Sequence, residues 1–232
     1  MSCTNWIPNG RRRDSIPSSP PTDFSGAVLA GGSSRRMGHD KAFAPFEGRP
    51  LAEIARRALL EAGAVEVLSI GGDEARLAAL GFTAIPDDAA GEGPLGGLLT
   101  ALRTATADWV AVLATDLPHA SAATVRELLA YTGDGTDAVV PLLDGRPQPA
   151  HAVWRRDCRQ LLEPLFAAGE RRLRQSLDHV RTRLVTVPDP RSLRDVDTPG
   201  DLQSLSTPPR GTPRAVAGGP AGGGSAASKR GA

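Results

Sequence analysis

One short stretch of the chain combines residue types that suit the binding of phosphate groups. An apolar run over residues 26–30 leads directly into two glycines, two serines and three cations: Gly31, Gly32, Ser33, Ser34, Arg35, Arg36 and Lys41. Paired glycines let the backbone approach a ligand closely, and serines add hydroxyl and amide donors. We therefore expect this turn to hold a polyphosphate. Its spacing matches neither G-x-x-x-x-G-K-[ST] nor G-x-G-x-x-G, so the chain needs another class of nucleotide site.

The sequence L-A-G-G-S-S-R-R-M-G-H-D-K-A over residues 29–42 resembles the signature loop of the sugar-nucleotide-transferase-like nucleotidyltransferases. Within that superfamily it is most similar to the molybdenum cofactor guanylyltransferases. The resemblance implies Mg²⁺-dependent transfer of GMP from GTP to molybdopterin, with release of pyrophosphate. It also implies nucleotide contacts, partly through backbone amides, from one group of residues: Leu29, Ala30, Gly31, Gly32, Ser34 and Lys41. Lys41 and Arg35 would be catalytic and would neutralise charge on the phosphates.

Composition places the chain among ordinary globular proteins. Charged residues make up 23% and apolar residues 40% of the 232 residues, and the net charge of +1 gives no case for a nucleic-acid or membrane surface. The two cysteines and four histidines lack the spacing of a disulfide framework or a metal cluster. This cysteine usage suits a reducing compartment, so we expect a cytoplasmic protein, acting as a monomer.

Two changes in composition divide the chain. Residues 1–23 and 206–232 lack an apolar period and are expected to be disordered tails, the second rich in Pro, Gly and Ala. Residues 24–205 are expected to form one nucleotidyltransferase domain. It should be a Rossmann-like three-layer α/β domain with a mainly parallel, mixed sheet flanked by helices. Predicted strands cover residues 26–30, 66–70, 83–85, 109–114, 138–142, 150–154 (antiparallel) and 184–187. Predicted helices cover residues 51–62, 95–104, 122–131, 156–167, 171–180 and a short segment near 201–205.

Asp116 is the first candidate outside the signature loop. It follows the apolar strand 109–114, and ligands of open α/β sheets bind beyond the carboxyl ends of strands. Its carboxylate suits Mg²⁺, which prefers hard oxygen ligands; capping of the next turn is the structural alternative. The segment A-T-D-L-P over residues 114–118 is similar to the family's D-x-P segment. The resemblance implies that Asp116 binds both metal and nucleotide and takes part in catalysis.

Three further positions are expected to contact the nucleotide. Asp87 follows the strand 83–85 and matches a nucleotide-contacting aspartate of the family in order and spacing; a turn is its structural alternative. Gly96 lies in G-P-L-G-G-L, where the family has G-P-L-x-G, and either approaches the nucleotide or serves helix packing. Gly72 stands where close relatives often carry an asparagine, so only backbone groups remain for a contact there. This departure weakens the inference of guanine more than that of nucleotidyl transfer.

The segment D-V-D-T-P-G-D-L over residues 195–202 resembles the terminal motif of the family. Thr198 before Pro199 is the pattern of an N-cap followed by proline in the first helical turn. Asp197 is expected to be a second Mg²⁺ ligand beside Asp116; contact with the second substrate is the alternative. Some guanylyltransferases have asparagines where this chain has Asp195 and Asp197, and the acidic pair would tend to repel an anionic pterin phosphate.

Two segments resemble the acceptor side of the guanylyltransferases. They are Q-P-A-H-A-V-W from Gln148 and A-G-E-R-R ending at Arg171 and Arg172. The resemblance implies that these three side chains bind molybdopterin, whose phosphate suits the planar donor fork of arginine. For each arginine alone, a solvated basic start of a helix is the alternative.

Other functions stay open on the sequence. A sister enzyme that uses CTP, or another small phosphorylated acceptor, would keep the same motifs. A non-catalytic nucleotide-binding domain has less need of both Lys41 and Asp116, and an adaptor acting through the C-terminal tail lacks a convincing P-x-x-P pattern. The expected partners are GTP and molybdopterin, without nucleic acid or membrane. Transient contacts with other proteins of molybdenum cofactor biosynthesis are also expected.

Overall fold

A single sheet forms the middle layer of the protein in the computed structural model, which describes residues 21, 23–31 and 40–206. Its strand order is β10-β7-β9-β6-β1-β4-β5, with β8 paired to β7. The strands are β1 Ser25–Leu29, β4 Glu66–Ile70, β5 Thr83–Ile85, β6 Trp109–Ala114, β7 Ala138–Leu143, β8 Arg146–Pro147, β9 Ala152–Arg155 and β10 Thr182–Thr186. β9 is antiparallel to both β6 and β7, and β8 to β7, while the other pairs are parallel. The expected mixed sheet is thereby confirmed.

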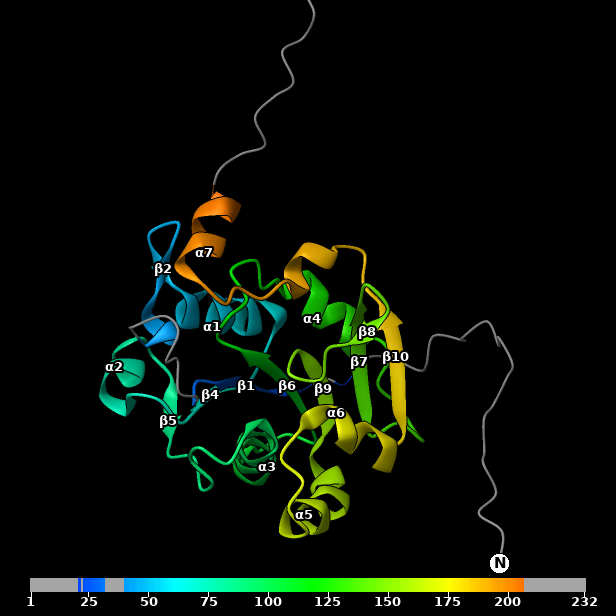
Figure 1. The fold of residues 1–232 in the computed structure, drawn as a ribbon. Coiled ribbons are helices and arrows are strands. Elements are labelled where there is room, and N and C mark those ends of the chain that lie inside the picture. The colour runs from blue at the N-terminus through cyan, green and yellow to red at the C-terminus, as the bar shows by residue number, and fades with distance from the viewer. Residues whose placement is uncertain (1–20, 22, 32–39, 207–232) are drawn as a thin grey trace, which may run out of the picture.

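Helices cover both faces of this sheet (Figure 1). α1 Leu51–Ala62, α2 Glu74–Ala79 and α4 Ala122–Leu129 lie on one face, and α3 Pro94–Thr104, α5 Arg159–Ala167 and α6 Leu173–Ser176 lie on the other. Neighbouring side chains on a strand point to opposite faces, so Val28 joins the first core and Ala27 the second. The three-layer α/β architecture follows from strands that are apolar on both sides. Within the described residues, none of the helices has the length and apolar character needed to cross a membrane.

Some element boundaries differ from the sequence expectations for local reasons. The strand expected at 150–154 begins only at Ala152, because the backbone of His151 is held in the preceding turn by a hydrogen bond to Gln148 O. The last strand begins earlier, at Thr182, because it pairs with β7 from that residue on. The helix expected at 171–180 is α6 followed by the 3-10 helix Leu177–His179 (η3), and α5 is preceded by the 3-10 helix Arg156–Cys158 (η2).

Two small elements were not expected from the sequence. α2 has only six residues, too few for a visible apolar period, and its N-terminus is capped by the Asp73 side chain, which accepts from Arg76 N at 3.1 Å. β2 Pro45–Phe46 and β3 Arg49–Pro50 form a hairpin whose turn residues Glu47 and Gly48 have φ of 48° and 80°. Such left-handed pairs are typical of tight two-residue hairpin turns.

A third apolar cluster fastens the C-terminal segment to the domain. After β10 the chain passes through the 3-10 helix Pro190–Leu193 (η4) to α7 Pro199–Ser206. Val196 and Leu202 from this segment are buried against Phe46 of the hairpin and Leu51 of α1. The segment therefore belongs to the folded unit and crosses the sheet edge above β6 (Figure 1).

The carboxyl ends of β1 and β4 approach each other so closely that glycine is required. The amides of Ala30 and Gly31 both donate to Ile70 O, at 3.0 and 2.9 Å. Gly71 has φ +69°, and a Cβ added there would lie 3.0 Å from Gly31 Cα, a backbone atom that cannot yield. Because Gly71 needs both a left-handed backbone and an absent side chain, it fixes the separation of the two strand ends.

We expect Gly71→Ala to destabilise the protein more than a glycine replacement that costs only backbone strain. The matched control is Gly135→Ala, where φ is +80° and no atom lies within 4 Å of the added Cβ. Left-handed strain alone costs about 1–2 kcal/mol, and overpacking at Gly71 adds roughly 1–3 kcal/mol. Urea unfolding of both variants measures the difference; equal losses in the free energy of unfolding would contradict the close approach.

A chain trimmed to residues 23–206 is expected to keep its melting temperature to within about 2 °C, because the three cores lie inside these bounds. A chain ending at residue 194 should melt far lower, since it also loses Val196 and Leu202 from the third cluster. Differential scanning calorimetry of the two chains checks this pair of results. A large loss in the longer chain would show that a removed tail contributes to the core.

Candidate active site

Three side chains from distant parts of the sequence meet at the carboxyl edge of the sheet. Asp116 follows β6 by two residues, and Lys41 begins the 3-10 helix Lys41–Phe43 (η1). Lys41 Nζ lies 3.2 Å from Asp116 Oδ2 and 3.2 Å from Asp197 Oδ1. The structure thus brings together the catalytic and metal-binding candidates at 41, 116 and 197, which are 75 and 156 residues apart in sequence.

Lys41 is positioned by the short helix that it begins. The Asp40 side chain is the N-cap of η1 and accepts from Ala42 N at 3.1 Å. Ala42 is buried in the first core, and the Phe43 ring carries the Arg76 guanidinium 3.5 Å above its centroid. Asp40 in the D-K-A sequence is therefore a cap, and its effect is to aim Lys41 at the carboxylates.

Two sets of hydrogen bonds in the terminal motif position Asp197. Val196 N donates to Asp116 O at 3.0 Å, which ties the segment directly to the end of β6. Asp201 Oδ2 accepts from the amides of Asp197 and Thr198, and Thr198 Oγ1 accepts from Asp201 N. This reciprocal capping box bears out the N-cap expected at Thr198. Its hydrogen bonds from the Thr198 and Asp197 amides lower the pKa of the Asp201 carboxyl.

The same edge holds a set of oxygen atoms suited to a divalent cation. Carboxylate oxygens of Asp116, Asp195 and Asp197 lie within 4.8 Å of one another. Such a set of hard ligands fits Mg²⁺, which binds through few carboxylates and completes its shell with water and phosphate oxygens. Asp195 joins the two expected ligands, Asp116 and Asp197, in this set. It lies close to Asp197 because these two aspartates flank the buried Val196.

Asp116 is ionised although it is mostly buried. Burial raises the pKa of this carboxyl, but the His151 imidazole and the Lys41 ammonium together lower it by more, so the pKa lies below its ordinary value. Its two oxygens have different surroundings: Oδ2 faces Lys41, whereas Oδ1 is buried without a hydrogen-bond partner among the described residues. A charged ligand is therefore available at neutral pH.

The nucleotide candidates gather where β1, β4 and β5 end and α3 begins. Asp87 Oδ1 accepts from Ala89 N at 3.0 Å, which is the turn contact that the structural alternative for Asp87 predicts. Asp87 Oδ2 lies toward Gly31, because a Cβ added at Gly31 would be 3.4 Å from this oxygen. Gly72 has φ +81°, and a Cβ would lie 2.9 Å from Leu77 Cδ1 of α2. Close packing of α2 thus explains why glycine stands at this position.

Two expectations about backbone donors change. The amides of Ala30 and Gly31 are paired with Ile70 O, so they are not available to phosphate oxygens in this conformation. Gly96 N bonds to Gly93 O, and a Cβ at Gly96 would lie 2.7 Å from Ala89 Cβ, so packing accounts for this glycine. Leu29, at the end of β1, packs against the second core. The candidates Gly32, Ser34 and Arg35 lie outside the described residues.

Gln148 lies in the turn between β8 and β9. Its amide donates to Pro141 O at 2.9 Å, and its side-chain Nε2 donates to Arg146 O at 3.2 Å. His151 N in turn donates to Gln148 O at 3.0 Å. The turn that carries Gln148 is therefore hydrogen-bonded to His151, the buried residue whose imidazole lies near Asp116.

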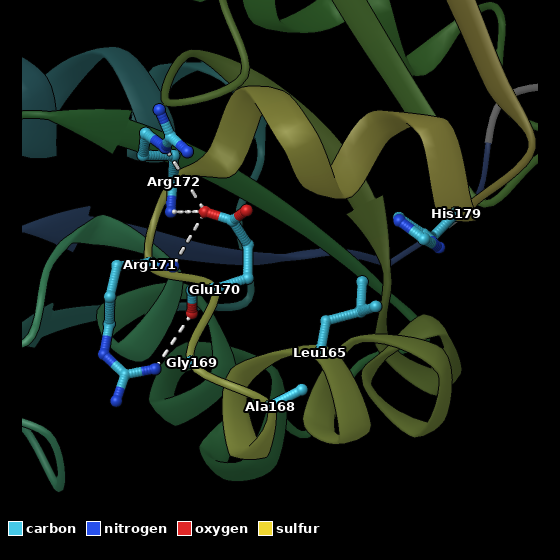
Figure 2. Close-up of a pocket in the computed structure, with 7 residues that line it drawn as sticks. All are labelled: Leu165, Ala168, Gly169, Glu170, Arg171, Arg172 and His179. Carbon is cyan, nitrogen blue, oxygen red and sulfur yellow. Dashed lines mark hydrogen bonds and ion pairs between the residues drawn. The ribbon is translucent and has the colours of Figure 1, made fainter.

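Arg171 and Arg172 lie beside an open hollow of about 400 Å³ and extend in different directions (Figure 2). Arg171 stacks on the Phe166 ring at 4.0 Å, donates to Phe166 O at 2.7 Å and pairs with Glu92 at 2.6 Å. Its guanidinium therefore joins two loops and is already engaged. Arg172 is 72% exposed and contacts only Glu170, at 3.4 Å, among the described ion pairs. Arg172 is thus the more exposed and the less engaged of the two arginines.

The hollow is adjacent to the start of α3, because Leu95 N donates to Arg171 O at 3.2 Å. Gly93, the N-cap of α3, has φ +96°, and a Cβ there would lie 3.1 Å from the same carbonyl. The G-P-L-G-G and A-G-E-R-R segments are thus packed together. This contact brings a candidate acceptor segment next to a candidate nucleotide segment.

Comparison with known proteins agrees with this arrangement. Residues 26–184 match the family described as "MobA-like NTP transferase domain". A "probable molybdenum cofactor guanylyltransferase" of Deinococcus radiodurans is 37% identical over 184 residues, which cover 79% of this chain and 94% of the relative. The crystal structure of "molybdopterin-guanine dinucleotide biosynthesis protein A" from Archaeoglobus fulgidus is similar with a TM-score of 0.65 and 25% identity, covering 78% of this chain and 96% of that one.

A more distant similarity extends to a synthetase whose structure contains CTP. A CMP:2-keto-3-deoxy-manno-octonic acid synthetase, solved in complex with CTP, matches 80% of this chain and 97% of its own with a TM-score of 0.61. At 19% identity this likeness shows the shared fold alone. The family match, by contrast, takes in the signature loop with Lys41 and the segment of Asp116, and it ends within β10, before the terminal motif that carries Asp197. The chain belongs to the family of MobA-like NTP transferase domains.

Proposed function

We propose that this protein is a molybdenum cofactor guanylyltransferase, which transfers GMP from GTP to molybdopterin and releases pyrophosphate. The observation that carries the proposal is the meeting of Lys41 with Asp116 and Asp197 at 3.2 Å each. Relatives with the guanylyltransferase name support the choice of substrates. We further propose that it acts as a monomer in the cytoplasm and contacts other proteins of the same biosynthesis transiently.

The reaction requires attack by a phosphate oxygen of molybdopterin on the α-phosphorus of GTP. A new P–O bond forms while the bond from the α-phosphorus to the bridging oxygen breaks, and that oxygen leaves with the electron pair on pyrophosphate. A phosphate monoester is already largely ionised near neutral pH, so no general base is needed. Catalysis then depends on positioning and on stabilising negative charge.

Lys41 supplies positive charge to this reaction. Its ammonium would neutralise charge on the α-phosphate and on the departing pyrophosphate, together with Arg35 of the signature loop. Asp116, Asp197 and Asp195 would hold Mg²⁺, which would supply positive charge that stabilises the phosphates during the reaction. The Lys41 ammonium lies at these carboxylates, 3.2 Å from both Asp116 and Asp197, where its charge would also be near the phosphates.

The remaining assignments follow the carboxyl edge of the sheet. We assign the nucleotide to the surface formed by Leu29, Ala30, Gly31, Gly32, Ser34, Lys41, Gly72, Asp87, Gly96 and Asp116. Ala30 and Gly31 would take part through atoms other than the amides bonded to Ile70 O, and Leu29 and Gly96 would shape the surface through their packing. We assign molybdopterin to the surface formed by Gln148, Arg171 and Arg172. On this second surface Arg172 would contact the substrate, and Arg171 would hold the loop in place through Phe166 and Glu92.

Base selection is tested by a pyrophosphate-release assay with molybdate-loaded molybdopterin and Mg²⁺, run in parallel with GTP and CTP. Turnover with GTP alone is expected. Turnover with CTP alone would mean that the protein transfers a cytidylyl group and not a guanylyl group. The proposed role of Lys41 in stabilising charge on the phosphates would be unaffected. If neither nucleotide reacts, isothermal titration with each nucleotide separates a wrong acceptor from a domain that only binds.

Lys41→Ala is expected to lower kcat by about 10²-fold or more, equivalent to about 2.7 kcal/mol of lost transition-state stabilisation. Arg49→Ala is the matched control, because Arg49 is an exposed cation on the nearby hairpin and has no described ion pair. Steady-state kinetics and the melting temperature of both variants are measured together. A folded Lys41→Ala protein with near-wild-type kcat would remove Lys41 from the mechanism.

A further inference from the structure

His151 is a buried residue beside the candidate active site that the mechanism above does not use. It directly precedes β9 and is 5% exposed. The next residue, Ala152, pairs with Val112 near the end of β6, which places His151 on the approach to Asp116. Its backbone is fixed by the bond from His151 N to Gln148 O. The imidazole therefore occupies a defined position in the core of the site.

Two buried polar atoms here lack hydrogen-bond partners among the described residues, and they belong to facing side chains. One is Asp116 Oδ1 and the other is His151 Nδ1. The remaining imidazole nitrogen, His151 Nε2, lies 3.9 Å from Asp116 Oδ1. A hydrogen bond needs a separation near 2.9 Å, so the two groups face each other about 1 Å beyond bonding distance.

An unpaired buried carboxylate oxygen is unfavourable, so a shorter distance between His151 Nε2 and Asp116 Oδ1 would stabilise the site. Leaving a buried polar atom without a partner costs about 1–3 kcal/mol, and more when it carries charge. If the imidazole proton is on Nε2, one contact satisfies Oδ1 and leaves only the Nδ1 lone pair unpaired. Hydrogen bonds of this kind are commonly long in unliganded sites and shorten in the complex.

We propose that His151 is a positioning residue, whose Nε2–H donates to Asp116 Oδ1 and thereby directs Oδ2 toward the cation. The role rests on the proposed function, in which Asp116 holds the metal ion. Oδ2 is the oxygen that Lys41 contacts, and the same ammonium contacts Asp197 Oδ1. With one oxygen fixed by the imidazole, the carboxylate cannot rotate away from the other ligands.

The test measures Mn²⁺, as a paramagnetic probe of the Mg²⁺ site, binding to the full chain by EPR titration. His151→Phe keeps ring volume and removes the donor, and it should weaken Mn²⁺ binding by about 10-fold or more, as loss of an outer-shell partner does. His151→Gln carries a donor of similar reach and should stay within about 3-fold of wild type. The matched control is His119→Phe, which keeps a ring against Phe46 and leaves the Asp116 surroundings unchanged.

A lower melting temperature would reveal that His151→Phe is poorly folded. A second pair of variants tests the role of His151 in that case. His151→Asn has the same chemistry as His151→Gln with one methylene less, so its amide falls short of Oδ1. Mn²⁺ should therefore bind His151→Asn more weakly than His151→Gln. In turnover assays the KM for Mg²⁺ should rise in His151→Phe, while kcat should recover at saturating Mg²⁺.

Three results would overturn the inference, and they differ in what else they affect. Wild-type Mn²⁺ affinity in folded His151→Phe, or equal affinity in the Gln and Asn variants, would remove the positioning role and leave the metal site intact. Failure of the wild-type protein to bind Mn²⁺ would overturn both the positioning role and the metal-binding role of Asp116.

Discussion

Repulsion among carboxylates is the constraint on which the site depends. Oxygen atoms of Asp116, Asp195 and Asp197 lie within 4.8 Å of one another, and two like charges at about 4 Å repel by roughly 1 kcal/mol in water and roughly 4 kcal/mol near a protein surface. A cation near the three carboxylates offsets this repulsion. Lys41 fills this role here, but Asp197 is 68% exposed, and such exposed pairs contribute only about 0–1 kcal/mol. Lys41 thus has one partly buried partner, Asp116, and one exposed partner, Asp197.

The meeting of Lys41 with the carboxylates requires that three distant segments be placed accurately, and a different structural feature holds each segment. A strand buried on both faces delivers Asp116, a side-chain cap starts the helix of Lys41, and a capping box orders the segment of Asp197. The bond from Val196 N to Asp116 O joins the third segment to the first. The apolar cluster of Phe46, Leu51, Val196 and Leu202 connects the third segment to the second. Chemistry at the sheet edge thus depends on the packing of a C-terminal segment outside the sheet.

The sequence predicted the parts of this arrangement that short motifs and apolar periods encode. Lys41, Asp116 and Asp197 stood in recognisable motifs, and the change of direction at β9 followed from the Gly/Pro-rich turn before it. The inward engagement of Arg171 was not predictable, since it depends on Phe166 and Glu92, which only folding brings near. The pairing of the Ala30 and Gly31 amides with Ile70 O likewise depends on the register of β1 and β4. His151 stood in a recognised segment, but only its distance from Asp116 gives it a role.

Gly72 shows how packing and base selection can be linked. Leu77 of α2 occupies the space that a side chain at residue 72 would need, so the short helix and the glycine require each other. A base that approaches here meets main-chain groups, one of which, the Gly71 amide, is already bonded to Ile85 O. Guanine presents two N–H donors and a carbonyl acceptor on its pairing edge, and main-chain carbonyls and amides are the complementary groups. Any contact between a base and residue 72 would therefore be made by main-chain groups and not by a side chain.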